Sequence, residues 1–365
     1  MTEVPARRAA GVALCLVMLV GSGAALTACS GGKPAEVASA RATPSRTAAA
    51  TRGKIVSPAA PGRRGTSGAG VLPAPAPLVP FGASEGGAGT WHPAGRYVDR
   101  VPAVYETTLV PPGGTQAAGI AWLDTALLSA RLYSGSGSPG GGPYRYTAPV
   151  QPAQAMSLVA TFNGGFKMAD AHGGYYTEGR VIDPLVRGAA SLVIYASRRI
   201  TVGAWGTDVR MAPDVVAVRQ NLVPLVADGL PTALATGSDW KAWGSTCGAS
   251  SCAASVPGIE HLWRSGAGVT ADGALVYVVG PKLDPLQLAQ LLVRAGAVRG
   301  MQLDINPAWP VFASYAPASP RGLAAPRNGS KLLATTKQGP WTFFEPWWAR
   351  DFVTMSARAA MPGGS

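Results

Sequence analysis

The sequence contains little charge, few cysteines and few histidines. Asp, Glu, Lys and Arg together make up 14% of the 365 residues, and there are 4 cysteines and 3 histidines. This number of cysteines is too small for a disulfide-dense scaffold, and so few histidines cannot form a histidine-rich metal site. The chain also lacks Gly-x-Ser-x-Gly, His-Glu-x-x-His and Walker motifs. Their absence removes the commonest signatures of α/β-hydrolases, zinc proteases and P-loop proteins.

Glycine and proline are abundant, with 47 and 32 residues. Together with the low charge, this content argues against a coiled coil or a helical bundle. The apolar share of 47% is too high for a wholly disordered protein. The net charge of +12 is unevenly spread, because about half of it lies in residues 30–80. The rest of the chain is only mildly basic, so we expect no nucleic-acid partner, and an anionic surface or polymer fits the charge equally well.

The N-terminus has the pattern of a bacterial lipoprotein signal. Arg7 and Arg8 precede an apolar run over 9–20 that is too short for a membrane-spanning helix. Leu26-Thr-Ala-Cys29 resembles a lipobox, which predicts removal of residues 1–28 and lipid attachment to Cys29. We therefore expect a protein held at the outer, extracytoplasmic face of a bacterial cell membrane. A plain secretory signal with a chance cysteine is the alternative.

The remaining chain divides into a tail and one domain. Residues 29–80 are rich in Ala, Pro, Gly, Ser, Thr and Arg, which predicts a disordered tether. Residues 81–358 alternate short apolar runs with turn residues and predict a domain, followed by a disordered tail over 359–365. Strands are expected over 117–123, 126–133, 158–162, 191–195, 200–204, 215–219, 274–279 and 300–303, with a hairpin turn at 271–273.

One helix is expected over 284–296. Asp284 provides the N-cap, Pro285 occupies the first turn and Gly296 ends the helix. The fold class that follows is α+β, with a mixed, largely antiparallel β-sheet core and a few packing helices in a single domain.

Polar residues follow an apolar strand at Asn163-Gly164-Gly165. The glycines allow backbone N–H groups to approach a ligand closely. Asn163 offers a hydrogen-bond donor and an acceptor, and Lys167 offers a positive charge. The alternative is a tight turn that binds nothing.

Two further places combine strands with chemically useful side chains. Arg264 and Ser265 begin an apolar strand, and an arginine there can hold a phosphate or carboxylate through two hydrogen bonds. Asp304 closes the strand that follows the predicted helix, which places a carboxylate where it can face a pocket. The alternatives are a solvated arginine and an Asx turn begun by Asp304 or Asn306.

In this order, the three places resemble the phosphodiester glycosidase family. The matching segments are Asn163-Gly-Gly-Phe166, Arg264-Ser-Gly-Ala-Gly268, Ala295-Gly-Ala297 and Leu303-Asp304, and the resemblance covers 158–316. The family has Gly-Gly after the aspartate, where this chain has Ile305-Asn306. The resemblance implies a cell-surface hydrolase that cleaves a sugar from a glycosyl phosphodiester.

We expect the phosphate to be held mainly by Arg264, with Asn163, the Gly164 and Gly165 amides and Lys167. Ser265 and Asn306 are further candidates for substrate binding. Asp304 would assist at the anomeric carbon, and the second carboxylate would come from Glu178 or Asp183, unless these two are only solvated loop residues. Among six tryptophans near the site segments and the C-terminus, Trp309 is the best candidate for stacking on a sugar; core packing is the alternative for most of the others.

The other expectations concern cysteines, cofactors and partners. Cys247 and Cys252 predict a local disulfide in an oxidising exterior. No cofactor is expected, and the sequence leaves a divalent metal open. The expected partners are a cell-wall or exported glycan or phosphopolymer, and the membrane through the lipid anchor.

Two other functions compete with hydrolysis of a glycosyl phosphodiester. One is a non-catalytic surface module that binds a wall glycan or phosphopolymer. The other is a serine acyl-transferase acting through Ser238-Asp-Trp-Lys241, although no Lys-Thr-Gly or Ser-Asp-Asn motif accompanies it.

Overall fold

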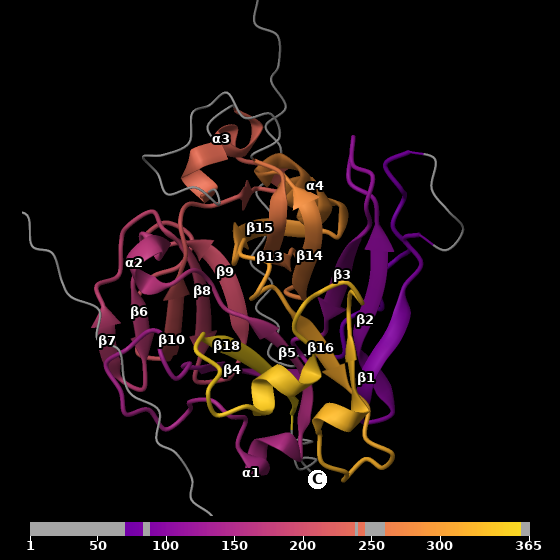
Figure 1. Ribbon diagram of the computed structural model, residues 1–365, viewed down its shortest axis with the longest axis vertical. Coiled ribbons are helices and arrows are strands. Elements are labelled where there is room, and N and C mark those ends of the chain that lie inside the picture. Colours follow the sequence, from indigo (N-terminus) through magenta and orange to yellow (C-terminus); the bar gives the residue numbers. More distant parts are fainter. Residues whose placement is uncertain (1–69, 83–87, 238–239, 245–259, 359–365) are drawn as a thin grey trace, which may run out of the picture. The chain divides into compact units, whose positions relative to one another are not determined.

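The structure is a computed structural model that describes residues 70–82, 88–237, 240–244 and 260–358. The chain divides into two units, Met1–Arg64 and Gly65–Ser365, and the described residues all belong to the second. Three β-sheets and a few helices make up this part (Figure 1). Each pair of neighbouring strands within the sheets is antiparallel. The β-rich α+β fold expected from the sequence is thus confirmed for the described residues, with antiparallel sheets.

The sheets have eight, five and five strands. The first has the order β1-β2-β3-β14-β13-β15-β11-β12. Its strands are β1 (His92–Val98), β2 (Val101–Leu109), β3 (Ala118–Leu123), β14 (Leu275–Leu283), β13 (Leu262–Thr270), β15 (Ala297–Gln302), β11 (Val226–Ala227) and β12 (Leu230–Pro231). The second consists of β7 (Arg180–Asp183), β6 (Tyr175–Thr177), β10 (Val215–Gln220), β8 (Ala190–Tyr195) and β9 (Ile200–Ala204). The third consists of β17 (Gly329–Lys331), β16 (Phe312–Tyr315), β5 (Leu158–Asn163), β18 (Phe352–Ala357) and β4 (Leu128–Tyr133).

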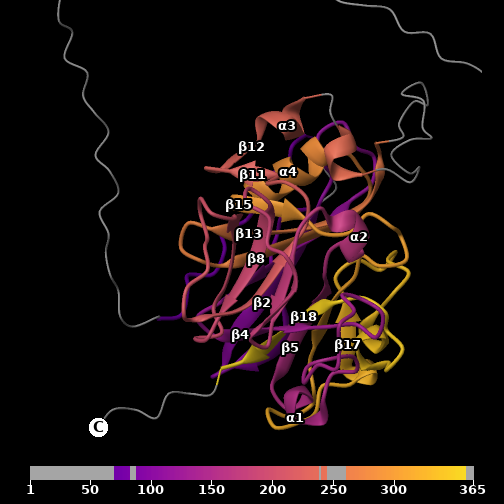
Figure 2. The same cartoon turned by 90° about the vertical axis from the view of Figure 1, so that its left-hand side faces the viewer.

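The helices are short apart from one. They are α1 (Pro152–Ala155), α2 (Met168–Ala171), α3 (Ala233–Thr236) and α4 (Pro285–Arg294), with 3-10 turns η1 (Trp240–Trp243), η2 (Pro326–Asn328) and η3 (Pro340–Phe344). Figure 2 shows α3 and α4 at one end of this unit and α1 with β17 at the other.

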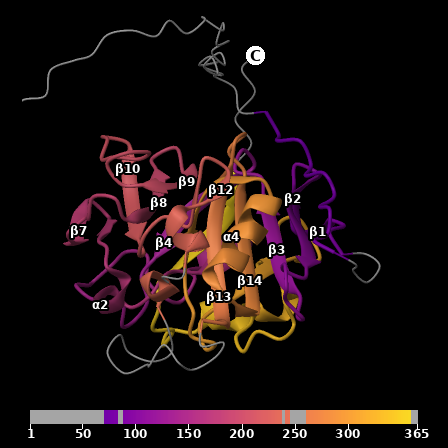
Figure 3. The ribbon, with the colours of Figure 1, turned by 90° about the horizontal axis from the view of Figure 1, so that it is seen from above.

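Local signals in the sequence fix α4. The Asp284 carboxylate accepts from Gln287 N at 2.6 Å, while the Gln287 side chain accepts from Asp284 N at 3.1 Å, which forms a capping box. Gly296 adopts a φ of 92°, which permits the chain to turn out of the helix. The apolar face, with Leu288, Leu291 and Leu292, is buried against β13, β14 and β15. Figure 3 shows α4 lying over β13 and β14. The predicted helix is confirmed.

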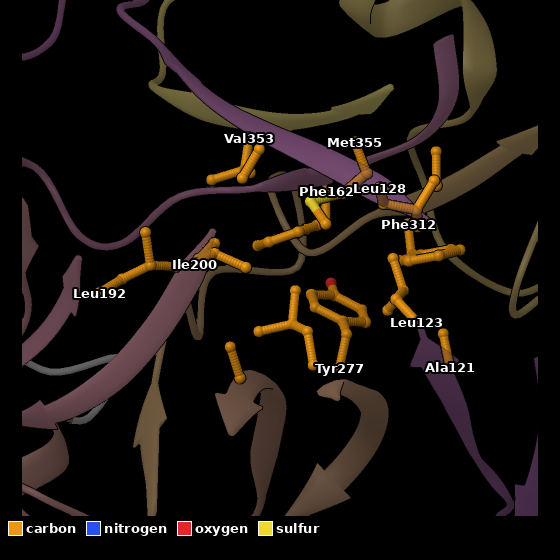
Figure 4. Close-up of a cluster of buried hydrophobic side chains, with 14 of the residues drawn as sticks. Ala121, Leu123, Leu128, Phe162, Leu192, Ile200, Tyr277, Phe312, Val353 and Met355 are labelled. Atoms are coloured by element: carbon orange, nitrogen blue, oxygen red, sulfur yellow. The ribbon is translucent and has the colours of Figure 1, made fainter. Parts of the chain in front are cut away.

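The main core is shared by all three sheets. Figure 4 shows Phe162 from the third sheet, Tyr277 from the first and Ile200 from the second pointing into one cluster. The Phe162 and Tyr277 rings lie 5.4 Å apart. Burial of each large apolar side chain contributes about 2 kcal/mol to the stability of the fold. Because the three sheets share this core, it holds them together.

The expected strands are confirmed with small changes at their ends. The predicted strand 126–133 begins at Leu128, because the Asp124 carboxylate accepts from Ala126 N at 2.7 Å and holds a turn first. The predicted strand 274–279 continues to Leu283.

The expected tether boundary is wrong. Residues 70–80 belong to the folded unit, since Leu72 N donates to the Asp124 carboxylate at 2.9 Å and Leu78 packs against the core. The signal segment 1–28, the rest of the tether and the tail over 359–365 lie outside the described residues.

Candidate active site

The three segments singled out in the sequence meet where β5, β13 and β15 come together. The Asn163 amide donates to Ser265 Oγ at 3.0 Å. Ser265 N donates to the Asp304 carbonyl at 2.9 Å, and Asp304 N donates to Ser265 Oγ at 3.1 Å. All three residues are buried. The three segments therefore meet, and Ser265 rather than Arg264 is the side chain that links Asn163 to Asp304.

Asn163 organises this meeting point. Its Oδ1 accepts from Tyr277 OH at 2.6 Å and from Val311 N at 3.1 Å, while Nδ2 also donates to the Gly164 carbonyl at 2.7 Å. Both acceptor sites and both donors of the amide are therefore in use. The expected substrate-binding role is wrong for Asn163 in this arrangement, because it has no free hydrogen-bonding group.

Asp304 forms a buried ion pair with Arg350. Arg350 Nη2 lies 2.7 Å from Asp304 Oδ2, and Asn306 N donates to Asp304 Oδ1 at 2.9 Å. Burial raises the pKa of Asp304 to about 6, although the Arg350 charge and backbone hydrogen bonds act in the opposite direction. A carboxyl group with this pKa can exchange a proton near neutral pH, as general acids and bases do.

Arg350 retains a donor for a ligand. Its Nη2 also donates to the Gly165 carbonyl at 2.6 Å. Among the described residues, nothing accepts a hydrogen bond from its buried Nε. The guanidinium lies 5.2 Å from the centre of the Trp309 ring, which in turn meets Trp348 edge-on at 5.0 Å. An unpaired buried donor is costly, and a water molecule or a ligand oxygen at Nε would remove that cost.

A second buried ion pair lies on the other side of the Gly-Gly turn. Arg219 Nε donates to Asp351 Oδ2 at 2.8 Å, and the Asp351 carbonyl accepts from Gly164 N at 2.8 Å. Arg219 also donates to the Phe166 carbonyl. The Gly164 amide is thus occupied by the protein itself, which corrects its expected role in phosphate binding.

The two glycines are required by close packing. A Cβ at Gly164 would collide with the Asp351 carboxylate, and one at Gly165 with the Asn221 side chain. Asn221 holds the same turn by accepting from Phe166 N at 2.9 Å. Gly165 contributes a carbonyl to Arg350, so its position shapes the Asp304–Arg350 pair.

Arg264 lies away from this pair, which contradicts its expected role as the phosphate ligand. Neighbouring side chains on a strand point to opposite faces, and Ser265 takes the face of Asp304. The buried Arg264 side chain instead donates to the carbonyls of Leu283 at 2.7 Å, Glu260 at 2.8 Å and Trp243 at 3.2 Å, and to Gln302 Oε1. Its role is to fasten these backbone segments together.

The two candidates for the second carboxylate do not contact Asp304. Glu178 accepts from Arg145 N and Tyr146 N, both at 2.9 Å, and lines a separate cavity. Asp183 ends β7 opposite Tyr175. Asp351 is the carboxylate that packs closest to the Gly-Gly turn, but Arg219 holds both of its oxygens.

Two of the expected substrate-binding residues, Lys167 and Asn306, are exposed. Lys167 is exposed and follows the Gly-Gly turn. Asn306 is exposed, and its Oδ1 closes a turn by accepting from Ala308 N at 3.0 Å. Beyond Ile305 and Pro307 lies a cavity of about 350 Å³ that also includes Trp263 and Lys282, while Asp304 and Arg350 are not part of its lining.

Several expectations lie outside the described residues, namely those on Cys29, Cys247, Cys252 and Ser238. In the described ranges, no three His, Cys, Asp or Glu side chains are grouped closely enough to hold a metal ion. No helix in the same ranges is both long and apolar enough to cross a membrane.

Sequence reasoning missed Arg350, Asp351, Arg219 and Asn221. The same signal that found Asn163 marks two of them, because Arg219-Gln220-Asn221 also lies at the end of an apolar strand, β10. Arg350 and Asp351 directly precede the apolar strand β18. Polar residues at strand ends are therefore the common signal of this site.

The sequence matches no family model and no curated protein. Among solved structures, the chain is similar to the catalytic domain of zebrafish N-acetylglucosamine-1-phosphodiester alpha-N-acetylglucosaminidase, auto-inhibited by its pro-peptide. The TM-score is 0.40 and the identity 14%, over 73% of this chain and 88% of that one. A hypothetical protein from Synechocystis gives 0.39 and 11%, over 73% and 64% of the two chains. An exported protein from Burkholderia pseudomallei gives 0.34 and 12%, over 66% and 74%.

Proposed function

We propose that this protein hydrolyses a glycosyl phosphodiester at the Asp304–Arg350 pair and releases the sugar. The observation that carries the proposal is the pair itself. A carboxyl group with a pKa of about 6 and a guanidinium with an unpaired Nε lie in contact beside Trp309. Such a pair supplies an acid–base group and a phosphate-binding group within one site. The substrate class is taken from the resemblance of the sequence motifs to the phosphodiester glycosidase family.

In this proposal, Arg350 takes the phosphate-binding role that the sequence had assigned to Arg264. Arg350 Nη2 donates to Asp304 Oδ2 and to the Gly165 carbonyl, so the phosphate would accept its hydrogen bond from the unpaired Nε. Lys167 adds a second positive charge, because it follows the turn whose Gly165 carbonyl accepts from Arg350. The Trp309 ring provides a flat apolar face for the sugar.

Asp304 acts as the base in the proposed reaction. Water gives a proton to the carboxylate, and its oxygen bonds to the anomeric carbon. The bond from that carbon to the phosphate oxygen breaks, and a phosphate monoester leaves with the electron pair. Because this leaving group is a weak base, it needs little help from a general acid, and one carboxylate suffices.

Access to the pair requires a local movement. The side chains of Asp304 and Arg350 are only 4% and 6% exposed. The adjoining residues Asn306 and Trp347 are exposed, and the turn that Asn306 closes is the proposed point of entry. Lids and loops of this kind commonly control entry to hydrolase sites.

The experiment is an assay of sugar release from methyl phosphodiesters of N-acetylhexosamines and hexoses linked at the anomeric carbon. We expect turnover by the full chain, and a fall of about a hundredfold or more in Asp304→Asn and Arg350→Gln. Arg327→Gln is the matched control, because Arg327 is exposed and distant in sequence from all site segments. Melting curves establish that each variant is folded. Release of sugar at the wild-type rate by both site variants would refute the proposal.

A non-catalytic binding module is the second candidate. The observation that favours it is the burial of Asp304, which is followed by Ile305-Asn306 where the family resemblance leads to glycines. Binding of the same phosphodiesters without sugar release would assign the protein to this class.

The proposal includes a location. The lipobox-like segment supports a lipid on Cys29 and a position on the outer face of a bacterial membrane. Mass spectrometry of the mature N-terminus would detect a diacylglycerol on Cys29, and an unmodified N-terminus at another residue would rule this out.

A further inference from the structure

A second cavity, separate from the Asp304–Arg350 pair, is lined by arginines. Its volume is about 350 Å³, and its lining includes Arg131, Arg145 and Arg198 together with Tyr146 and Glu178. The cavity lies between the edge strand β4 and the neighbouring strands β8 and β10. It shares no lining residue with the proposed catalytic site.

The positive charge in this cavity is not neutralised by the protein. Glu178 is the only acidic residue in the lining, and its two oxygens accept from the backbone N–H groups of Arg145 and Tyr146 at 2.9 Å. None of the ion pairs within the described ranges includes any of the three arginines. The cavity therefore holds more positive than negative charge.

Arg131 is the deepest of the three cations. It is half-buried, and its guanidinium lies 3.7 Å from the centre of the Tyr146 ring. Burial, followed by the charges of Arg198 and Arg145, lowers the pKa of Arg131, although the Tyr146 hydroxyl acts in the opposite direction. Arg131 is thus close enough to Arg198 and Arg145 to be repelled by them, and a bound anion would relieve that repulsion.

The cavity is built on anchored backbone. Ala130 N on β4 donates to the Arg198 carbonyl at 2.9 Å. Arg358 Nη1 donates to the neighbouring Ser197 carbonyl at 2.6 Å. Arg198 has a φ of 61° in the turn between β8 and β9. Because this turn is tied to β4 and to Arg358, the side chains of Arg131 and Arg198 start from anchored backbone.

We propose that this cavity binds the phosphate group of a phosphate ester, as a site distinct from the Asp304–Arg350 pair. Clustered guanidinium groups hold phosphate oxygens through charged hydrogen bonds, and the excess of positive charge suits a doubly charged monoester or two successive diesters. The site would let the protein hold a phosphate-bearing chain independently of any hydrolysis.

The first test locates phosphate by protection of arginines in the full wild-type chain. Phenylglyoxal modifies accessible arginines, and mass spectrometry measures the extent at each position. We expect glycerol 3-phosphate and inorganic phosphate to slow modification of Arg145 and Arg198 at least about threefold, with no change at the exposed Arg327. Equal modification with and without phosphate would overturn the proposal.

The second test measures affinity by calorimetry with the same two probes. The Arg350→Gln background removes phosphate binding at the catalytic pair, so the two sites are distinguished. In that background, Arg145→Gln with Arg198→Asn should weaken binding about tenfold, since asparagine tolerates the positive φ at 198. Arg327→Gln should leave it unchanged. Unchanged affinity in the double variant would overturn the proposal, whatever the catalytic assay shows.

Phospholipid vesicles distinguish the two sources of such a phosphate group, a lipid headgroup and a dissolved phosphate ester. Protection of Arg145 and Arg198 by phosphatidylglycerol vesicles, but not by phosphatidylcholine vesicles, would assign the site to lipid headgroups. Protection only by the dissolved phosphate esters would assign it to a soluble compound or polymer.

Discussion

Arg350 Nη2 lies 2.7 Å from Asp304 Oδ2, although the two residues are 46 positions apart in the chain. Both are buried, and each is the main charge partner of the other. Removal of one charge from such a pair leaves the other uncompensated and typically costs about 3–5 kcal/mol. Asp304→Asn and Arg350→Gln each remove one of these charges, so stability must be measured beside the assay for both variants.

The pH dependence of activity should follow Asp304. If Asp304 acts as a base, activity is lost as pH falls below about 6, the pKa to which burial raises this group. Arg350 lowers that pKa, so in Arg350→Gln the remaining activity should already be lost at a higher pH than in the wild type. The measurement is the pH profile of kcat for both proteins. If the acidic loss of activity has the same midpoint pH in the variant and the wild type, a group other than Asp304 titrates.

Gly164→Ala should destabilise the fold. The added methyl group would collide with the Asp351 carboxylate, which Arg219 holds in place. Overpacking of this kind costs about 2 kcal/mol, and urea unfolding measures it. Gly137→Ala is the control, because a Cβ there would make only an ordinary contact with Ala349. Equal stability of the two variants would contradict the described packing of the turn.

Arg264→Gln should act on stability rather than on substrate affinity. The substitution leaves the buried carbonyls of Leu283, Glu260 and Trp243 short of their charged donor. We expect a loss of about 3 kcal/mol in the free energy of unfolding, with a KM close to that of the wild type. A raised KM in a protein of unchanged stability would return Arg264 to the phosphate-binding role.

Glu106 should make the fold less stable at alkaline pH. Burial raises the pKa of Glu106 to about 7 in the folded protein, although a hydrogen bond from Ser314 acts in the opposite direction. The folded state then binds this proton more tightly than the unfolded chain. The contribution of Glu106 to stability is therefore greatest below pH 4.5 and is lost as pH rises through 7. Burial of Asp304 acts in the same direction.

The test is Glu106→Gln, which resembles the protonated acid. At pH 8 it should raise the free energy of unfolding by about 2 kcal/mol, with little effect at pH 5. Urea unfolding at both pH values provides the comparison. Equal pH dependence in the variant and the wild type would mean that Glu106 does not titrate in this range.

The sequence was most informative where the determinants are local. The limits of α4 follow from Asp284, Pro285 and Gly296, all of which act within a turn or two of their own position. The predicted strands have the observed centres, because short runs of apolar and β-branched residues such as 158–162 favour a buried strand. The observed strand ends differ from the predicted ones by a few residues where a side chain such as Asp124 accepts a hydrogen bond from the backbone and forms a turn.

The site was predictable only in part, since pairing depends on the fold. The sequence predicted that the segments of Asn163, Arg264 and Asp304 meet, and in the structure Ser265 instead of Arg264 links the other two. The partner of Asp304 did not, because Arg350 comes from a distant segment that β18 brings alongside β5. Arg264 was misassigned because the sequence did not show which face of β13 its side chain takes.

The most direct test of the central claim is hydrolysis of a glycosyl phosphodiester in heavy-oxygen water, with mass analysis of both products. Attack of water at the anomeric carbon beside Asp304 predicts the label in the released sugar and none in the phosphate monoester. Label in the phosphate would show cleavage of the phosphorus–oxygen bond and contradict the account.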